Sequence, residues 1–90
     1  MNITDVRIRM MQKDTLKLKA VASITIDDCF VVHDIKVIDG TEGYFIAMPN
    51  RKTADGEYKD IAHPLNTETR NQLAEIVLNA FKKELEKVEE

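Results

Sequence analysis

Residues 16–26 carry the longest regular alternation in the chain and constrain its fold more than any other segment. Leucine, alanine or isoleucine stands at every even position from 16 to 26, and lysine, serine or threonine stands at most of the odd positions between them. Successive side chains of a β-strand point to opposite faces, so this period predicts a strand with one dry face. A dry face must be covered, and the chain therefore needs a sheet with a second layer packed on it.

Two further strands flank this one. In residues 2–11, Val6, Ile8 and Met10 alternate with charged neighbours, which predicts a first strand that a polar turn at 12–15 connects to the next. A two-residue turn, Asp27-Asp28, leads into a third strand over 29–38. Its almost continuously apolar sequence predicts a central strand with both faces at least partly covered.

The next segment predicts a fourth strand and a projecting element. A hairpin loop at 39–43, with glycine where positive φ is needed, precedes a strand over 44–48. Pro49 either ends this strand or places it at a sheet edge. Asp55-Gly56 is a strong turn signal, and residues 57–61 after it form either a short fifth strand or a ribbon arm.

The last third of the chain is predicted to be one amphipathic helix. Apolar residues recur at i, i+3, i+4 and i+7, and Asn66 or Thr67 is suited to cap the N-terminus because a short side-chain oxygen can accept a bond from a free first-turn N–H. This predicts an α+β fold: an antiparallel sheet of four to five strands with one C-terminal amphipathic helix packed on it. The predicted apolar stripe consists of Leu73, Ile76, Val77, Ala80, Phe81, Leu85 and Val88.

Length and composition indicate one domain over residues 1–90, with an acidic tail at 84–90 that is expected to fray. No segment approaches the roughly 20 apolar residues of a membrane-spanning helix. The N-terminus lacks the basic and apolar blocks of a signal peptide. The chain's one cysteine, Cys29, cannot form an internal disulfide, so a cytoplasmic location is expected.

Candidate catalytic residues form no recognised arrangement. Cys29 and His33 are four residues apart, about 13 Å along an extended strand, which is too far for a thiolate–imidazole pair. His33 and Asp34 are expected to project to opposite faces, with His33 partly buried and hydrogen-bonded, and His63 is expected to buttress the junction before the helix. The three glycines at 40, 43 and 56 follow no phosphate-binding spacing. We therefore predict no enzyme, no metal site, no cofactor and no small-molecule substrate.

The polar stretch 47–66 is the best candidate for a functional surface, because specific residues on a loop usually serve binding. Arg51 and Lys52 follow a proline, Lys59 comes shortly after, and Tyr58 and Tyr44 are possible stacking rings. Paired cations on a stiffened loop suit phosphate contact, and exposed aromatics suit unpaired bases. The net charge of −3 argues against coating nucleic acid by bulk electrostatics, and a basic pair is also common at ordinary solvated turns.

The chain contains three long distinctive strings, VVHDIKVIDG at 31–40, FIAMPNRKT at 45–53 and DGEYKDIAHP at 55–64, together with ITDVRIR near the N-terminus and AVASITI at 20–26. In this order these strings resemble the bacterial SpoVG family, the stage V sporulation protein G or septation regulators. The resemblance covers residues 2–80. Arg51-Lys52 matches the basic pair of the family's Met-Pro-Ser-Lys-Arg-Thr pattern, in reversed order and after Asn50.

The resemblance implies a small cytoplasmic protein, dimeric through its strands, that binds DNA and RNA and regulates gene expression, with roles in sporulation and septation. With the basic residues read above, it predicts a homodimeric nucleic-acid-binding regulator without covalent chemistry. The alternative is a protein-interaction module that regulates a cell-division or transcription partner through an exposed strand edge. The residues predicted to contact nucleic acid are Arg51, Lys52, Lys59 and Arg70, with Arg7 and Arg9 extending the surface.

Overall fold

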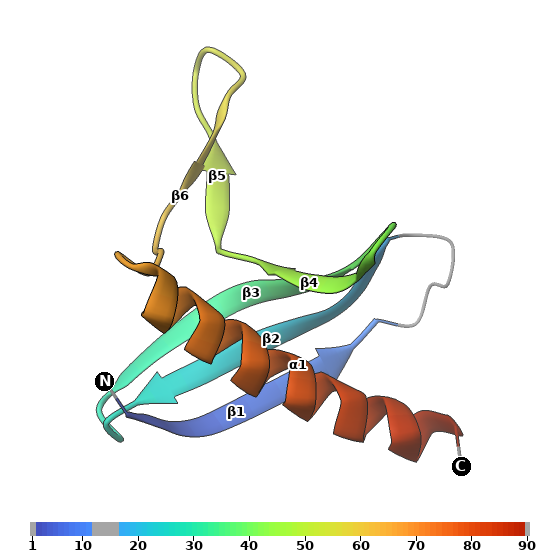
Figure 1. Cartoon of the computed structure of the whole chain (residues 1–90). Coiled ribbons are helices and arrows are strands. Elements are labelled where there is room, and N and C mark those ends of the chain that lie inside the picture. The colour runs from blue at the N-terminus through green and yellow to red at the C-terminus, as the bar shows by residue number, and fades with distance from the viewer. Residues whose placement is uncertain (1, 12–16, 90) are drawn as a thin grey trace.

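The structure, a computed structural model, describes residues 2–11 and 17–89 (Figure 1). Strands β1 to β4 form an antiparallel sheet in the order β1-β2-β3-β4, and β5 and β6 pair only with each other. The predicted α+β class is confirmed, and the ribbon-arm alternative for residues 57–61 is the one observed. The elements are β1 Ile3–Met10, β2 Leu18–Ile26, β3 Phe30–Gly40, β4 Gly43–Ala47, β5 Asn50–Lys52, β6 Tyr58–Asp60 and α1 Thr67–Glu89. The turn predicted at 12–15 lies outside the described residues.

One helix covers one face of the four-stranded sheet (Figure 1). From α1 the core takes Leu73, Val77 and Phe81, at i, i+4 and i+8 of the predicted stripe. Burying a large apolar side chain contributes about 1.5–3 kcal/mol, so this stripe supplies much of the energy that holds the helix on the sheet. The sheet contributes Ala20, Ala22, Ile24, Ile35 and Val37 to the same core.

The turn between β2 and β3 has positive φ at Asp27 and Asp28, 51° and 57°. The Cys29 N–H donates to the Ile26 carbonyl at 3.0 Å. Positive φ at both central residues is the pattern of a type I′ hairpin turn, and aspartate tolerates it better than most residues. The turn also includes Cys29, so β3 begins at Phe30 instead of residue 29.

Strand β3 lies between β2 and β4, but only its second half has both neighbours. Pairing with β4 is limited to residues 36–40. Phe30 and Val31 are 65% and 47% exposed. The prediction that both faces of this strand are at least partly covered is wrong for its first half, because α1 covers only one face of the sheet (Figure 1). Since β4 pairs only with residues 36–40, the first half of β3 has a free strand edge among the described residues.

A β-bulge interrupts β3 at His33 and Asp34. Ala22 pairs with Ile35 and Ile24 with Val32, so both bulge residues lie opposite Ser23 alone. Asp34 has a φ of 66°, in the left-handed region. The expectation that His33 and Asp34 project to opposite faces assumed a regular strand and is wrong, because the bulge brings both residues to line the same hollow.

The helix begins as predicted, with Asn66 as its cap. The Asn66 Oδ1 accepts a hydrogen bond of 2.8 Å from the Thr69 N–H, which satisfies one of the free first-turn donors. At the other end, the helix continues through Glu89 and includes an ion pair between Lys87 and Glu84 at 3.4 Å. Fraying of the acidic tail stays a prediction. Within residues 2–11 and 17–89, no helix combines the length and apolar character needed to span a membrane.

Candidate nucleic-acid interface

The β5–β6 ribbon forms an arm that projects from the body of the molecule (Figure 1). Pro49 is buried at its base, and its carbonyl accepts a 2.7 Å hydrogen bond from the Ile61 N–H. Proline fixes its own backbone φ, and this bond closes the ribbon where it leaves the sheet. The arm is thus anchored at its base, while every residue of β6 is exposed.

The arm's tip is closed by a hydrogen-bonded turn. The Thr53 N–H donates to the Glu57 carbonyl at 2.7 Å, and the Gly56 N–H donates to the Thr53 carbonyl at 3.0 Å. The Thr53 hydroxyl adds contacts to Asp55 at 3.3 Å and to the Glu57 carbonyl at 3.1 Å. Gly56 has a φ of +85°, which glycine adopts without strain. These bonds fix the register of the two strands and hence of the cations on them.

The register brings together three of the predicted contact residues. Arg51 lies directly opposite Lys59, and Lys52 lies directly opposite Tyr58. Directly opposed residues share a face of a ribbon, so one face presents two cations and the other a cation beside an aromatic ring. The Tyr58 ring is 69% exposed. Within the described residues, these three cations make no hydrogen bond or ion pair with a carboxylate.

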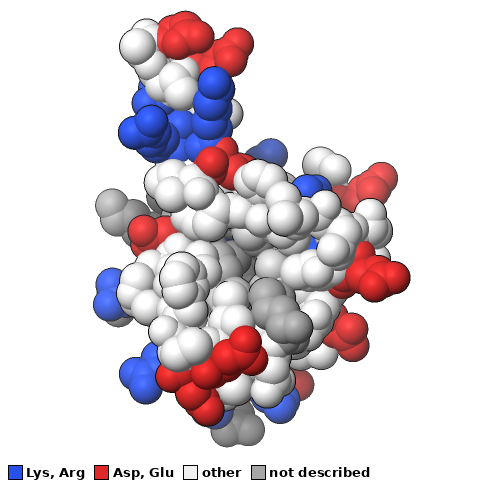
Figure 2. Space-filling view, turned by 90° about the vertical axis from the view of Figure 1, so that its left-hand side faces the viewer, with Lys and Arg blue, Asp and Glu red and all other residues white. Residues whose placement is uncertain are grey.

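The charged side chains of the arm lie in two zones, a basic band formed by Arg51, Lys52 and Lys59 and an acidic tip (Figure 2). Figure 2 shows Lys and Arg over the arm below a tip coloured for acidic side chains. The acidic residues of the tip turn are Asp55 and Glu57. Like charges directly opposite each other destabilise a strand pair. The Arg51–Lys59 pair therefore weakens the ribbon slightly, and an anion bound between the two side chains would remove that cost.

Arg70 lies in the first turns of α1, which residues 61–66 connect to the arm. It is exposed and borders a shallow hollow of about 250 Å³ with residues 64–67. The N-terminal end of a helix carries a partial positive charge, so this position also favours an anion. Arg70 thus stands at the foot of the arm as a separate cation rather than as part of the band.

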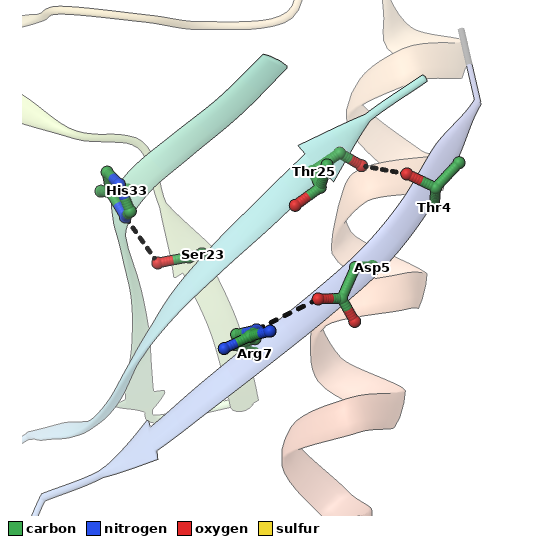
Figure 3. A network of polar contacts seen from close by, with 6 residues as sticks. All are labelled: Thr4, Asp5, Arg7, Ser23, Thr25 and His33. Carbon is green, nitrogen blue, oxygen red and sulfur yellow. Dashed lines mark hydrogen bonds and ion pairs between the residues drawn. The ribbon is translucent and has the colours of Figure 1, made fainter. Parts of the chain in front are cut away.

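Arg7 and Arg9 lie on β1, at the opposite edge of the sheet from β4. Neighbouring strands are about 4.8 Å apart, so β1 and β4 are separated by roughly 14 Å. Figure 3 shows Arg7 on the sheet face that carries Ser23, away from the helix, and Arg9 lies on the same face, opposite Val21. They form a second basic surface that is separate from the arm.

The residues considered for catalysis are dispersed. Cys29 is exposed in the β2–β3 turn, and His63 precedes the helix, with its Nδ1 3.1 Å from the Pro64 carbonyl. His33 is exposed rather than partly buried, and its Nδ1 lies 3.0 Å from the Ser23 hydroxyl. No group of three or more His, Cys, Asp or Glu side chains in the described part of the chain is placed to hold a metal ion.

Sequence reasoning missed two relations that the structure makes plain. The cross-strand pair of Arg51 and Lys59 depends on the register of the ribbon, which no local pattern specifies. The contact of Ser23 with His33 depends on the bulge at residues 33–34. Aspartate at position 34, one of the few residue types enriched in the left-handed region, is the only local signal, and it is weak.

The comparisons with known proteins agree with the family suggested by the motifs. A family model described as SpoVG matches residues 1–83. The SpoVG protein of Lachnospira eligens is 66% identical over 83 residues, covering 92% of this chain and 93% of the relative. The SpoVG protein of Agathobacter rectalis is 60% identical over 88 residues, covering 98% of this chain and all of the relative. The names of both relatives refer to septation. The chain therefore belongs to the SpoVG family, a family related to septation and sporulation.

Proposed function

We propose that the protein is a cytoplasmic regulator of gene expression that binds DNA or RNA through the β5–β6 arm. The observation that carries this proposal is the cross-strand pair of Arg51 and Lys59, two like charges without a carboxylate partner among the described residues. Phosphate suits such a pair, because an arginine fork can bind two of its oxygens.

The other face of the arm supports the same function. Lys52 lies beside the exposed ring of Tyr58, so an unpaired base could stack on the ring while its phosphate contacts the lysine. Arg70 at the foot of the arm would add a further phosphate contact. The acidic tip at Asp55 and Glu57 repels phosphate, which would confine a strand to the basic band.

The test is a salt titration of binding to matched RNA, single-stranded DNA and duplex DNA. The Arg51→Ala, Lys52→Ala double variant should weaken binding to all sequences. The slope of log affinity against log salt should fall by about 1.8 for duplex DNA and about 1.4 for single strands, the values for two lost phosphate contacts. A matched control is the Lys82→Ala, Lys83→Ala double variant, which removes the same charge from exposed positions on α1. Equal losses in both variants, or none in the first, would contradict the assignment to the arm.

The free edge of β3 favours a second proposal, that the protein pairs with a further strand. Within the described part of the chain, residues 30–35 have a neighbouring strand only on the β2 side, and Phe30 and Val31 beside this edge are largely exposed. An unprotected strand edge is a site for strand addition, by a second copy in a homodimer or by a cell-division or transcription partner.

This edge can be tested separately from the arm. The Phe30→Lys, Val31→Lys double variant places lysines where natural sheets use them to prevent pairing. Sedimentation analysis should then report a monomer where the wild type is a dimer. A partner that still binds the arm variant but not the edge variant would favour the protein-interaction role, with nucleic-acid affinity as a secondary property.

A further inference from the structure

The sheet face opposite the helix contains an open hollow over β1, β2 and β3, well away from the arm. Its volume is about 780 Å³. Because each pair of opposed residues shares a face, Arg7 with Ser23 and Arg9 with Val21 lie on this side of the sheet. The residues that line the hollow include Arg7, Arg9, Met11, Val21, Ser23, His33 and Asp34.

Both arginines of the hollow have guanidinium N–H donors without a partner among the described residues. The Arg7 Nε donates to Asp5 at 3.1 Å, a contact that leaves the two terminal nitrogens of the guanidinium without a partner among the described residues. The Arg9 side chain makes no hydrogen bond or ion pair with the described residues, 2–11 and 17–89. Figure 3 shows the Arg7 side chain lying over β1 beside Asp5, in an ion pair that is exposed to solvent.

The bulge in β3 adds a third donor. It brings His33 toward β2, where the Ser23 hydroxyl lies 3.0 Å from His33 Nδ1 (Figure 3). When the hydroxyl donates to Nδ1, the ring carries its proton on Nε2, which is then a donor. The bulge holds a non-glycine residue, Asp34, at a φ of 66°, a conformation that costs energy and recurs at ligand sites.

We propose that this hollow binds a phosphomonoester group. A tetrahedral dianion can accept from the Arg7 and Arg9 guanidinium groups and from His33 at the same time, whereas a planar carboxylate offers oxygens in one plane only. Met11 and Val21 supply apolar wall for the organic part of the ligand. The site requires no reaction and stands apart from the arm, so it does not rest on the function proposed for the arm.

Two carboxylates near the hollow repel a bound anion, so removing the charge of one of them should raise the affinity. Asp5 competes for Arg7, and Asp34 lines the hollow itself. Asparagine has the shape of aspartate and tolerates the left-handed region equally well, so Asp34→Asn removes the charge and keeps the bulge. A unit charge a few ångströms away in exposed surroundings changes affinity by up to about fivefold.

The experiment is an amide chemical-shift titration at constant ionic strength. The probes are inorganic phosphate, adenosine 5′-monophosphate, and a short DNA oligonucleotide with and without a 5′-phosphate. We expect saturable shifts at residues of the hollow, with a dissociation constant of about 1 mM for phosphate, a fair affinity for so small an exposed ligand. Arg9→Gln should weaken binding about tenfold, and Asp34→Asn should tighten it by twofold to fivefold.

Further comparisons in this titration distinguish the possible ligands and test whether the hollow is independent of the β5–β6 arm. Stronger binding of the monophosphate than of the phosphorylated oligonucleotide assigns the hollow to small molecules, and the reverse order assigns it to the phosphorylated end of a strand. The Arg51→Ala, Lys52→Ala variant should leave phosphate binding at the hollow unchanged, whatever it does to nucleic acid. Shifts that grow linearly without saturation, or that Arg9→Gln leaves unchanged, would overturn the proposal.

Discussion

The arm and the sheet–helix body of this protein are stabilised in different ways. Among the described residues, the body buries eight apolar side chains, from β2, β3 and α1, in one continuous core. The arm has none of these, and is held by the turn at Thr53 and the bond between Ile61 and Pro49. The body can therefore lose a surface charge at little cost, whereas the arm depends on a few backbone bonds to keep its cations in place.

This difference separates folding from binding. The cations of the arm contribute nothing to the core, so selection can change them without unfolding the protein. An extended two-stranded ribbon is only marginally stable by itself, which would let the proposed nucleic-acid surface adapt to a ligand. Variants in each region should accordingly produce separable effects on stability and on affinity.

The largest effect is expected from Phe81→Ala, which breaks the body. The Phe81 ring is 1% exposed, and it meets the Tyr44 ring edge-on at a centroid distance of 4.9 Å. Removing a buried phenylalanine costs about 3–5 kcal/mol through lost burial and the cavity left behind. Urea unfolding followed by circular dichroism should report this loss of free energy. A loss below about 1 kcal/mol would mean that the helix is not held by this core.

The next effect is expected from Gly56→Ala, which breaks only the arm. A methyl group there has open space, with the nearest atom, Lys52 Cε, at 4.0 Å, so the cost arises from the backbone at φ +85°. A non-glycine residue in the left-handed region costs about 1–2 kcal/mol. The tip turn should loosen, and nucleic-acid affinity should fall by up to about tenfold while the midpoint of urea unfolding stays unchanged.

Ala54→Gly is a control for this variant, because it alters the same exposed tip without demanding positive φ. If Gly56→Ala instead lowered the unfolding midpoint as much as a core substitution, the arm and the body would be one cooperative unit.

The sequence predicted the body well because its signals are local and repeated. The alternation predicted over 16–26 is observed as β2 from Leu18 to Ile26, and residue 16 lies outside the described residues. The stripe through Leu73, Val77 and Phe81 forms the buried face of α1, and Asn66 is its cap. The arm was predicted as one of two alternatives, since Pro49 and the Asp55-Gly56 turn indicate where a ribbon begins and reverses but not what it pairs with.

The sequence did not predict the β-bulge or the cross-strand cation pair, because both depend on how strands pair and not on a local pattern. The bulge at His33 and Asp34 arises from how β3 pairs with β2, and its partner Ser23 lies ten residues away. Likewise, Arg51 lies opposite Lys59 only because of the register in which β5 and β6 pair. Residue types indicated which side chains could bind phosphate, and only the strand pairing indicates which of them act together.

A smaller effect is expected at the junction between the two regions, from Asn66→Ala. Loss of the 2.8 Å bond to the Thr69 N–H leaves a first-turn donor without its cap. Replacing such a cap with alanine costs about 1 kcal/mol. Urea unfolding should detect this change, and Asn66→Asp should restore most of the stability because it keeps the accepting oxygen and adds a charge that the helix end favours. Failure of Asp to restore it would assign another role to Asn66.

The smallest effect is expected from Lys87→Ala at the end of the helix, far from both the core and the arm. Lys87 pairs with Glu84 at 3.4 Å, but its side chain is 72% exposed, so water and salt screen most of the attraction. Exposed pairs of this spacing contribute about 0.2–0.5 kcal/mol. The free energy of unfolding should thus change by less than about 0.5 kcal/mol, and nucleic-acid affinity should be unaffected. A clear loss of affinity would show that the C-terminal end of α1 contacts the same ligand as the arm. The binding surface would then extend from the arm onto the body, and binding would not be confined to the arm.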